Sequence, residues 1–522
     1  MRKLFVLFLT TLLTNSCTLA QTSSHYAEAI TTESAKEHLT VLTSKEYEGR
    51  GTGQNGGLRA ARYIAAHFEQ YGLTPVVNGS YFQPVALRRT SYKVGELQLG
   101  TLPLANGKDY FVQGDNAYQD FDAKEIIFIG YGIQDPKYNE LKGIDIKGKV
   151  VLLFNEDEPV GSNGHSLITG KKEISEWTVN RFKRIQELLK HKPQLILATG
   201  KIAQQMIQQG NNRNLLGRFQ LDDNTIETKQ ISQKTPIVYI AESVADEILK
   251  QAQTSLQEFK DSVSSTFKPT ASYIPLTVHA SMGILSEKLY DPNVLGLVEG
   301  TDLKDEIVVV CGHYDHDGIL PNGTFFPGAD DNGSGTVAVL ELARTFAQAK
   351  KEGNGPRRSI LFIALAAEER GLLGSKYYVA NPALPLHNTV ACINIDMIGR
   401  IDDKHLNSNH NYIHIIGTNK LSTDLKPIVE KANQEIQMEL DDMYNDPNDP
   451  LRLYYRSDHY NFAQKGIPSL FFFSGLHPHY HTPEDTVDKI DFPMMVKREK
   501  LIFHVAWDIA NRDNKPRVNI KE

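Results

Sequence analysis

The stretch EIVVVCGHYDHDG, residues 306–318, places an unbroken apolar run directly before a group of ionisable side chains. Such a run is typical of a strand that is buried on both faces of a parallel sheet. His313, Tyr314 and Asp315 follow where that strand is expected to end. Because ligands of open α/β sheets bind beyond the carboxyl ends of the strands, we expect a functional site at this point.

From residue 280 onward, strands of this kind alternate with amphipathic helices. The alternation predicts an α/β fold in which a mixed, mostly parallel sheet is flanked by helices. Near the N-terminus two more helices are expected, one begun by a capping box of Ser34 and Glu37 and one ended by Gly72. The expected strands of the main sheet cover residues 306–313, 357–367, 389–397, 411–418 and 467–475, and the expected helices cover 335–350, 368–378, 425–436 and 493–511.

The chain has 522 residues, of which 40% are hydrophobic, so it is long enough for more than one domain. Its formal net charge of -7 gives no reason to expect nucleic acid or an anionic membrane as a partner. Residues 96–275 contain short apolar strands but no cluster of ligand-type side chains. They predict a smaller α/β domain inserted between residues 21–95 and 276–522, which would form the main domain.

The N-terminus has the pattern of a secretory signal over residues 1–20, with an apolar run after two basic residues and cleavage after Ala20. The alternative is a lipoprotein signal in which Cys17 is the lipidated residue. We therefore expect an exported protein, periplasmic or extracellular, that is either free or lipid-anchored. No later segment is apolar enough for a transmembrane helix. Cys311 and Cys392 lie in apolar runs and are expected to be buried thiols rather than a disulfide framework.

Carboxylate and imidazole groups also follow the other expected strands. GADDNGSG, residues 328–335, begins a helix, and HPHYHTPEDT, residues 477–486, follows the last strand with three histidines at alternate positions. Zinc takes nitrogen and oxygen ligands of this mixture, and two ions about 3.5–4 Å apart can share one carboxylate. The pattern predicts a metal centre at one edge of the sheet. The carboxylates in question are Asp330, Asp331, Glu368, Glu369 and Asp396.

Taken together, six stretches resemble the co-catalytic zinc exopeptidases of the aminopeptidase Y and bacterial leucyl aminopeptidase family. The resemblance covers about residues 30–90 and 280–510, and residues 96–275 resemble the protease-associated domain that many members carry as an insert. It implies the zinc-exopeptidase fold and a secreted metallo-aminopeptidase that removes N-terminal residues from peptides with two zinc ions per chain. The stretches are GHYDHDG, GADDNGSGTVAVLELAR, AAEERGLLGS, NIDMIGR, SDHYNFAQKGIP and YHTPEDT.

The same resemblance implies roles for individual residues. Glu368 would be the general base that takes a proton from the attacking water. The implied metal ligands are His313 and Asp396 at one zinc, Glu369 and His481 at the other, and Asp331 as the bridge between them.

Residues around these ligands receive supporting roles. Asp315 is expected to accept the other ring N–H of His313 and so fix its tautomer. Tyr455 and Arg456 are expected to border the substrate pocket, and Ser457 or Asp458 to cap the following helix. His477 and His479 are expected to be solvated loop residues.

Several other functions remain open at this point. A dipeptidase or carboxypeptidase could use the same metal centre with a different pocket. A glutaminyl cyclase keeps several of the same ligands but works with one zinc, and a receptor-like ectodomain of this fold would be non-catalytic. The insert is expected to cover the active-site edge, with a plain spacer or binding module as the alternative.

Overall fold

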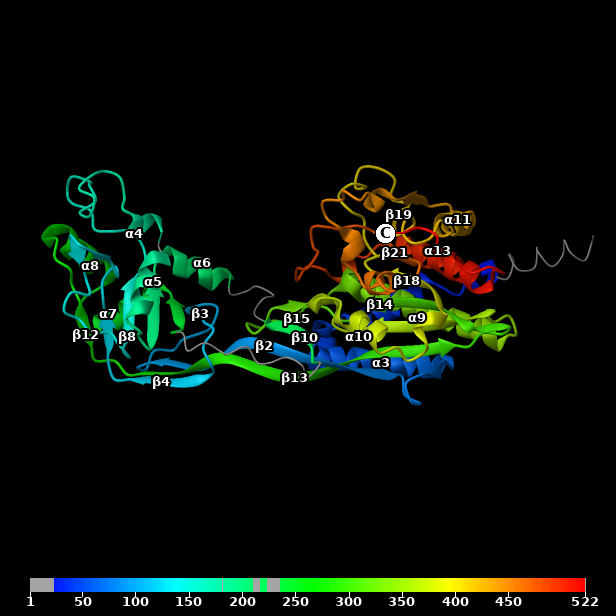
Figure 1. Cartoon of the computed structure of the whole chain (residues 1–522), viewed down its shortest axis with the longest axis horizontal. Coiled ribbons are helices and arrows are strands. Elements are labelled where there is room, and N and C mark those ends of the chain that lie inside the picture. The colour runs from blue at the N-terminus through cyan, green and yellow to red at the C-terminus, as the bar shows by residue number, and fades with distance from the viewer. Residues whose placement is uncertain (1–22, 181, 210–215, 223–234, 522) are drawn as a thin grey trace, which may run out of the picture.

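The computed structural model describes residues 23–180, 182–209, 216–222 and 235–521. The chain forms two lobes along its long axis, joined by an antiparallel ribbon of β2 (Phe82–Leu99) and β13 (Val278–Val298) (Figure 1). The predicted signal peptide, with Cys17, lies outside the described residues. Among the residues that are described, no helix has the length and apolarity that crossing a bilayer requires.

The larger lobe is built on a mixed sheet in the order β10-β2-β13-β17-β14-β18-β21-β19-β20. Four central strands are parallel and end at the same edge, while β19 runs antiparallel to β21. This arrangement confirms the predicted fold class. The strands are β14 (Leu303–His313), β17 (Arg358–Leu365), β18 (Thr389–Ile395), β19 (Tyr412–Ile416), β20 (Glu439–Asp441) and β21 (Ser469–Phe473), with β1 (Thr74–Pro75) beside β13.

Both faces of the central strands are buried, which explains the unbroken apolar runs. Val308 and Val310 of β14 face one hydrophobic core, while Val309 and Cys311 face another on the opposite side. Helices α2, α3, α9 and α13 cover the first face, and α10 and α12 cover the second. The helices are α2 (Thr32–Leu42), α3 (Asn55–Tyr71), α9 (Gly335–Lys351), α10 (Leu373–Ala380), α11 (Leu425–Ala432), α12 (His459–Ala463) and α13 (Phe492–Asn511).

The structure confirms the predicted end of α3 and the predicted state of the cysteines, but not the predicted start of α2. Helix α3 ends at Gly72 with φ 81°, as predicted. The predicted capping box is wrong, because Thr31 is the N-cap and accepts a hydrogen bond from the Ser34 N–H at 3.2 Å. Ser34 instead donates its hydroxyl hydrogen to Glu341 in the core. Cys311 and Cys392 are buried free thiols, as predicted.

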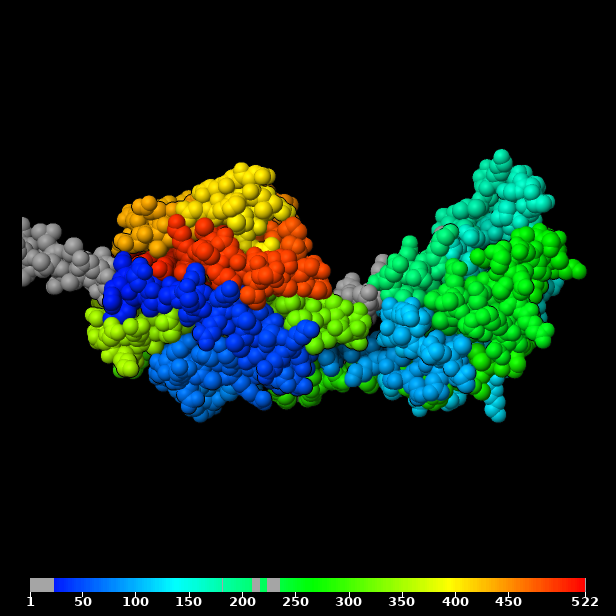
Figure 2. Space-filling model, turned by 180° about the vertical axis from the view of Figure 1, so that it is seen from behind, coloured from blue at the N-terminus to red at the C-terminus, as the bar shows by residue number. Residues whose placement is uncertain are grey.

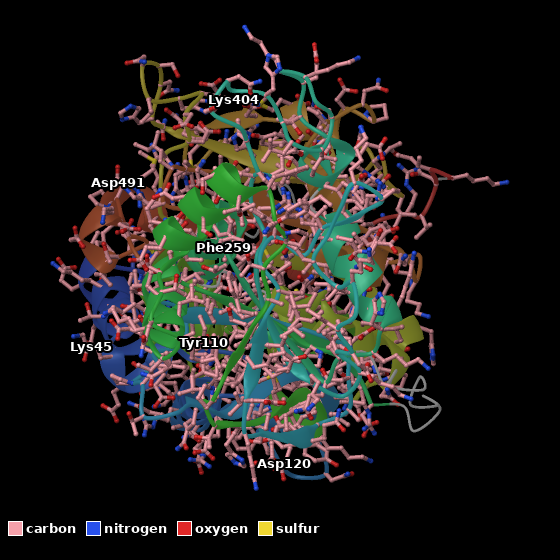
Figure 3. The ribbon with its side chains drawn as sticks, turned by 90° about the vertical axis from the view of Figure 1, so that its left-hand side faces the viewer. Lys45, Tyr110, Asp120, Phe259, Lys404 and Asp491 are labelled. Carbon is pink, nitrogen blue, oxygen red and sulfur yellow. The ribbon has the colours of Figure 1, made fainter. Side chains whose placement is uncertain are left out.

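The smaller lobe has its own six-stranded sheet in the order β12-β5-β8-β9-β11-β3, with separate hydrophobic cores on its two faces. A narrow waist separates the smaller lobe from the larger lobe (Figure 2). In the view along the long axis, the smaller lobe lies in front, and its residues Tyr110 and Phe259 are labelled (Figure 3). Its elements are β3 (Tyr110–Gln113), β5 (Ile126–Phe128), β8 (Val150–Phe154), β9 (Leu195–Thr199), β11 (Ile237–Ile240), β12 (Ser272–Ile274), α4 (Glu176–Val179), α5 (Phe182–Lys190), α6 (Lys201–Gln209), α7 (Glu242–Lys250) and α8 (Leu256–Thr266).

Most of residues 96–275, which the sequence predicts to be an insert, lie in the smaller lobe, whose junctions with the larger lobe are strands rather than loops. The predicted boundary after residue 95 falls inside β2, and the one after residue 275 falls just before β13. The body of the insert lies beside the larger lobe along the long axis (Figure 1). One strand, β10 (Arg218–Leu221), returns to pair with β2, and its Phe219 ring lies 5.6 Å from the Arg370 guanidinium.

Candidate metal centre

The ends of the parallel strands bring the predicted ligand residues together. His313 is the last residue of β14, and Asp396 follows directly after β18. Glu368 and Glu369 form a short turn after β17. Asp331 lies in the irregular segment before α9, whose shape is held by Asn332: its side chain donates to Ile395 O at 2.9 Å and accepts from Met397 N at 3.1 Å.

The Asp331 carboxylate lies between two separate imidazole–carboxylate pairs. On one side, Asp331 Oδ1 is 3.6 Å from His313 Nε2, which is itself 3.3 Å from Asp396 Oδ1. On the other side, Asp331 Oδ2 is 2.7 Å from His481 Nε2, which is 3.2 Å from Glu369 Oε1. Each oxygen of one carboxylate therefore faces a different donor set.

The donor atoms on the first side suit a cation. His313 Nε2 and Asp396 Oδ1 are both buried, and neither has a hydrogen-bond partner among the described residues. An unpartnered buried nitrogen and carboxylate oxygen are costly unless a cation lies between them. The mixture of imidazole and carboxylate ligands is one that zinc accepts.

The crowding of buried carboxylates at the site shifts the pKa values of its side chains. Burial and the neighbouring Glu369 together raise the pKa of Asp331 to about 6, against the opposing effect of His481 and His316. Burial would lower the pKa of His481, but Glu369 and Asp331 outweigh that effect and raise the pKa to about 10. Burial also raises the pKa of Glu368 well above its ordinary value, against the attraction of His313. Such a group of buried carboxylates favours the binding of cations.

Two aspartates, Asp485 and Asp330, hold the backbone of the bridging segment in place. Asp485 accepts hydrogen bonds from the backbone N–H groups of Asp330 and Asp331 at 3.0 and 3.1 Å. Asp330 accepts from Gly399 N at 2.6 Å and from the Ser334 hydroxyl at 2.9 Å. These bonds tie the bridging segment to the loops that follow β18 and His481.

Asp315 supports the site differently from the prediction. His313 Nδ1 bonds to the backbone oxygen of Asp315 at 3.0 Å, while the Asp315 carboxylate is 3.8 Å away. That carboxylate instead accepts from the backbone N–H of Glu368 at 3.0 Å and from the Thr52 hydroxyl at 2.9 Å. The carbonyl therefore orients the histidine, and the side chain positions the turn that carries Glu368.

His316 belongs to the site although the sequence reasoning passed over it. Its side chain is fully buried, and Nδ1 lies 3.1 Å from Glu369 Oε1 and 3.7 Å from Asp331 Oδ2. The available signal was its place in GHYDHDG, three residues after His313. A histidine that bonds to a ligand carboxylate typically fixes the orientation of that carboxylate.

The YRSDH segment supports the site without capping a helix. Neither Ser457 nor Asp458 makes the predicted side-chain cap of α12. Ser457 Oγ instead donates to Asp396 Oδ2 at 2.7 Å and accepts from Asn394 at 2.8 Å. Asp458 accepts from the Ser375 hydroxyl at 2.5 Å.

The histidine stretch is less exposed than expected. His477 is buried, with Nε2 3.3 Å from Asp330 Oδ2, so its prediction as a solvated residue is wrong. His479 is partly buried and bonds to Arg400 at 3.2 Å. Tight packing of the loop against Asp330 explains the difference.

A small cavity of about 40 Å³ opens beside the donor sets. Arg456 lines it and donates to the Tyr480 hydroxyl at 3.3 Å, whereas Tyr455 is 42% exposed and does not line it. The apolar wall of this cavity is formed by Met397, Leu453, Phe471, Phe473 and Leu476.

Known proteins are similar to this chain in sequence and in fold. Residues 293–506 match the family described as Peptidase family M28. Aminopeptidase YwaD from Bacillus subtilis (strain 168) is 30% identical over 242 residues, which is 44% of this chain and 47% of that protein. Leucine aminopeptidase 1 from Arthroderma otae is 34% identical over 215 residues, which is 39% of this chain and 55% of that protein. The chain thus spans about half the length of the curated relatives it matches.

A solved structure shares the fold of nearly the whole chain. The crystal structure of BSAP, a zinc aminopeptidase from Bacillus subtilis, aligns with a TM-score of 0.51 and 19% identity, covering 94% of this chain and 99% of that chain. The carboxyl ends of the parallel strands and the two donor sets lie within the same segment as the sequence match, residues 293–506. The similarity to peptidase family M28 therefore lies in residues 293–506, the segment that also carries the paired donor sets.

Proposed function

We propose that the protein is a zinc-dependent aminopeptidase that hydrolyses N-terminal residues from peptides at a centre of two metal ions. One observation carries the proposal: the two oxygens of Asp331 face two separate donor pairs, at 3.6 Å and 2.7 Å from their histidines. The names of the relatives support the substrate class, since they include aminopeptidases from a bacterium and a fungus. His313 and Asp396 would hold one ion, Glu369 and His481 the other, and Asp331 would hold both.

Zinc ions in this position would supply Lewis acidity to the scissile carbonyl and lower the pKa of a bound water. Glu368 would be the general base in this proposal. Its Oε2 lies 3.8 Å from His313 Nε2, and its backbone is fixed by the Asp315 carboxylate. It would take the proton of the attacking water and pass it to the leaving amine.

The cavity supports binding of a substrate side chain. Its apolar wall suits an uncharged side chain, and its polar side contains Asp331, Glu368 and His481. A free α-amine next to these carboxylates would be attracted to them. This arrangement favours cleavage next to the N-terminal residue of a peptide.

Arg456 favours a second candidate, a dipeptidase or carboxypeptidase. Its side chain lines the cavity, where the guanidinium could pair with a substrate carboxylate. Cleavage of aminoacyl, N-blocked and dipeptide substrates, measured together with metal content, separates the candidates. Cleavage of free-amine substrates alone is expected, with two of the bound zinc ions held by the metal-centre ligands, and equal cleavage of N-blocked substrates would contradict the aminopeptidase proposal.

Export and its signal form a separate part of the proposal. We infer cleavage after Ala20, so that the mature chain begins at Gln21. Mass spectrometry of the intact mature protein tests this directly. A mass that corresponds to a diacylated Cys17 at the N-terminus would instead establish the lipid-anchored form.

A further inference from the structure

A second buried group of imidazoles and carboxylates lies at the β19–β20 end of the sheet. It consists of Asp402 and His405 from the loop after β18, His414 from β19 and Asp441 from β20. His414 and Asp441 are directly opposite each other in the parallel strand pair. Lys404, labelled near the top of Figure 3, belongs to the same loop. No step of the proposed reaction uses these four residues, which we call the edge cluster.

The Asp402 carboxylate orients both imidazoles. Its Oδ1 lies 2.7 Å from His405 Nδ1, and its Oδ2 lies 2.8 Å from His414 Nε2. All three side chains are buried, with His414 fully so. Because a carboxylate only accepts, each of these two nitrogens carries a hydrogen. In a neutral imidazole the other ring nitrogen then presents a lone pair.

Both of those remaining nitrogens point to one oxygen of Asp441. His405 Nε2 lies 3.7 Å and His414 Nδ1 lies 3.3 Å from Asp441 Oδ2. His414 Nδ1 is buried, and among the described residues the acceptor that it faces is Asp441 Oδ2, at 3.3 Å and without good hydrogen-bond geometry. Neutral imidazoles would thus place two lone pairs against a carboxylate, which is unfavourable unless a cation lies between them.

The spacing of these atoms suits such a cation. Tetrahedral zinc ligands lie about 2.0–2.2 Å from the metal, which places neighbouring donor atoms about 3.3 Å apart. A carboxylate behind each ligating histidine is the usual arrangement that fixes the tautomer at zinc sites. We propose that His405, His414 and Asp441 bind a further zinc-type divalent cation, with Asp402 as the orienting carboxylate. The Asp441 side chain is 18% exposed, which leaves a path for the ion and a place for water as the fourth ligand.

The position of the edge cluster indicates a structural role. Tyr412, beside His414 on β19, accepts from Asp402 N at 2.8 Å and donates to Ser474 O at 2.5 Å. Gly475 has φ 100°, and a Cβ atom there would lie 2.4 Å from Asp402. The loop after β18 is therefore packed against the end of β21, next to Phe473 and Leu476 of the cavity wall. A cation in the edge cluster would fix that wall.

Metal analysis of the full chain tests the proposal. Wild type, dialysed with zinc, is expected to hold three ions per chain, and Asp441→Asn and His414→Gln two. Asp442→Asn is the matched control, because Asp442 is next in sequence but pairs with Lys426 on the surface, and it should retain three ions. Circular dichroism confirms that each variant is folded.

The design separates this inference from the proposed function. His481→Ala should lose one ion of the metal centre, and His481→Ala combined with Asp441→Asn should lose two. A chain in which Asp441→Asn holds as many ions as wild type would overturn the edge-cluster site, whatever its activity. The edge-cluster site would also be overturned if the wild-type chain held two ions and both were lost on replacement of metal-centre ligands. In that case the histidines of the edge cluster would be imidazolium ions paired with Asp402 and Asp441.

Discussion

At the scale of single residues, Glu368 is the sharpest test of the proposed chemistry. Glu368→Gln keeps the shape of the side chain but cannot take a proton. We expect turnover to fall by about 10²–10⁴-fold, while the metal content stays that of wild type. Steady-state kinetics and elemental analysis on the same preparation measure both quantities. Glu484→Gln, an exposed position in the loop after His481, serves as the control and should change neither.

The histidine stretch predicts an asymmetry among its three members. His481→Ala should lose one ion, because its imidazole faces Asp331 and Glu369. His477→Ala should keep the metal but unfold at a lower temperature, since the buried Asp330 carboxylate loses a neighbour 3.3 Å away. His479→Ala, only partly buried, is the control for the loop. Equal metal loss in all three variants would contradict the assignment of His481.

His38 predicts a contribution to acid sensitivity that is independent of the metal centre. Burial lowers its pKa to about 4, with help from the nearby His67 and Arg344. The folded value is below the unfolded one of about 6.5, so the unfolded chain binds the extra proton as the pH falls. The contribution of roughly 3 kcal/mol is complete above pH 6.5 and is lost between pH 6.5 and 4.

Comparison of variants isolates this effect. His38→Gln should show a shallower loss of unfolding free energy between pH 6.5 and 4 than wild type, as measured by urea denaturation. His410→Gln, at an exposed loop position, should follow the wild-type curve. Parallel curves for wild type and His38→Gln would exclude the assignment.

Most metal-centre residues were nominated from the sequence because they follow strands in fixed motifs. The supporting groups were harder to assign. Nothing in GHYDHDG shows that the Asp315 carbonyl, rather than its carboxylate, meets His313. Side-chain direction in a loop depends on packing partners far along the chain, such as Thr52 beside Asp315. The same holds for His316, whose burial against Glu369 is set by tertiary contacts.

At the scale of elements, Arg50 joins the segments around the metal centre. Its fully buried guanidinium donates to the carbonyl oxygens of Leu42, Tyr314, Pro327 and Gly328 at 2.6 to 3.0 Å. Arg50→Lys keeps the charge but cannot reach four acceptors in this geometry. We expect a loss of roughly 3 kcal/mol in unfolding free energy.

Denaturant unfolding of Arg50→Lys tests this, with Arg62→Lys at an exposed position on α3 as the control. The loss should be accompanied by weaker metal retention, since Tyr314 and Gly328 flank the ligand segments. A variant as stable as wild type would show that the guanidinium contacts contribute little.

The strands that could be predicted are those buried on both faces. Unbroken apolar runs such as 306–313 identify β14 and its parallel neighbours directly. The ribbon strands β2 and β13 were not predicted because their middle parts are polar and half exposed, as in the run Arg88-Arg89-Thr90-Ser91. These middle parts show neither a sustained apolar run nor a regular alternation of polar and apolar residues. Because β2 and β13 are far apart in the sequence, their pairing also leaves no local sequence pattern.

At the scale of the whole molecule, the two lobes have separate hydrophobic cores and should unfold separately. The chain contains two tryptophans, and Trp177 lies in the insert while Trp507 lies on α13. Each variant with a single tryptophan, Trp177→Phe or Trp507→Phe, therefore reports on one lobe. We expect two thermal transitions by fluorescence, and chelation of metal should lower only the transition reported by Trp507.

Calorimetry of the unmodified chain provides the control for the substitutions. One transition shared by both reporters, and moved equally by chelator, would show that the ribbon couples the lobes into a single cooperative unit. The predicted identity of the insert as a protease-associated domain is a separate question and stays a prediction.

The ribbon also determines the order in which the chain can be completed during synthesis. Phe82 pairs with Val294, so roughly 200 residues must emerge between the two partners. At about 5–20 residues per second, the amphipathic helices α2 and α3 wait some 10–40 s before the strands and helices that cover them exist. The insert, whose six strands lie within that interval, can fold during the wait. A nascent chain would thus hold one finished lobe while the apolar faces of its first two helices remain open to chaperones.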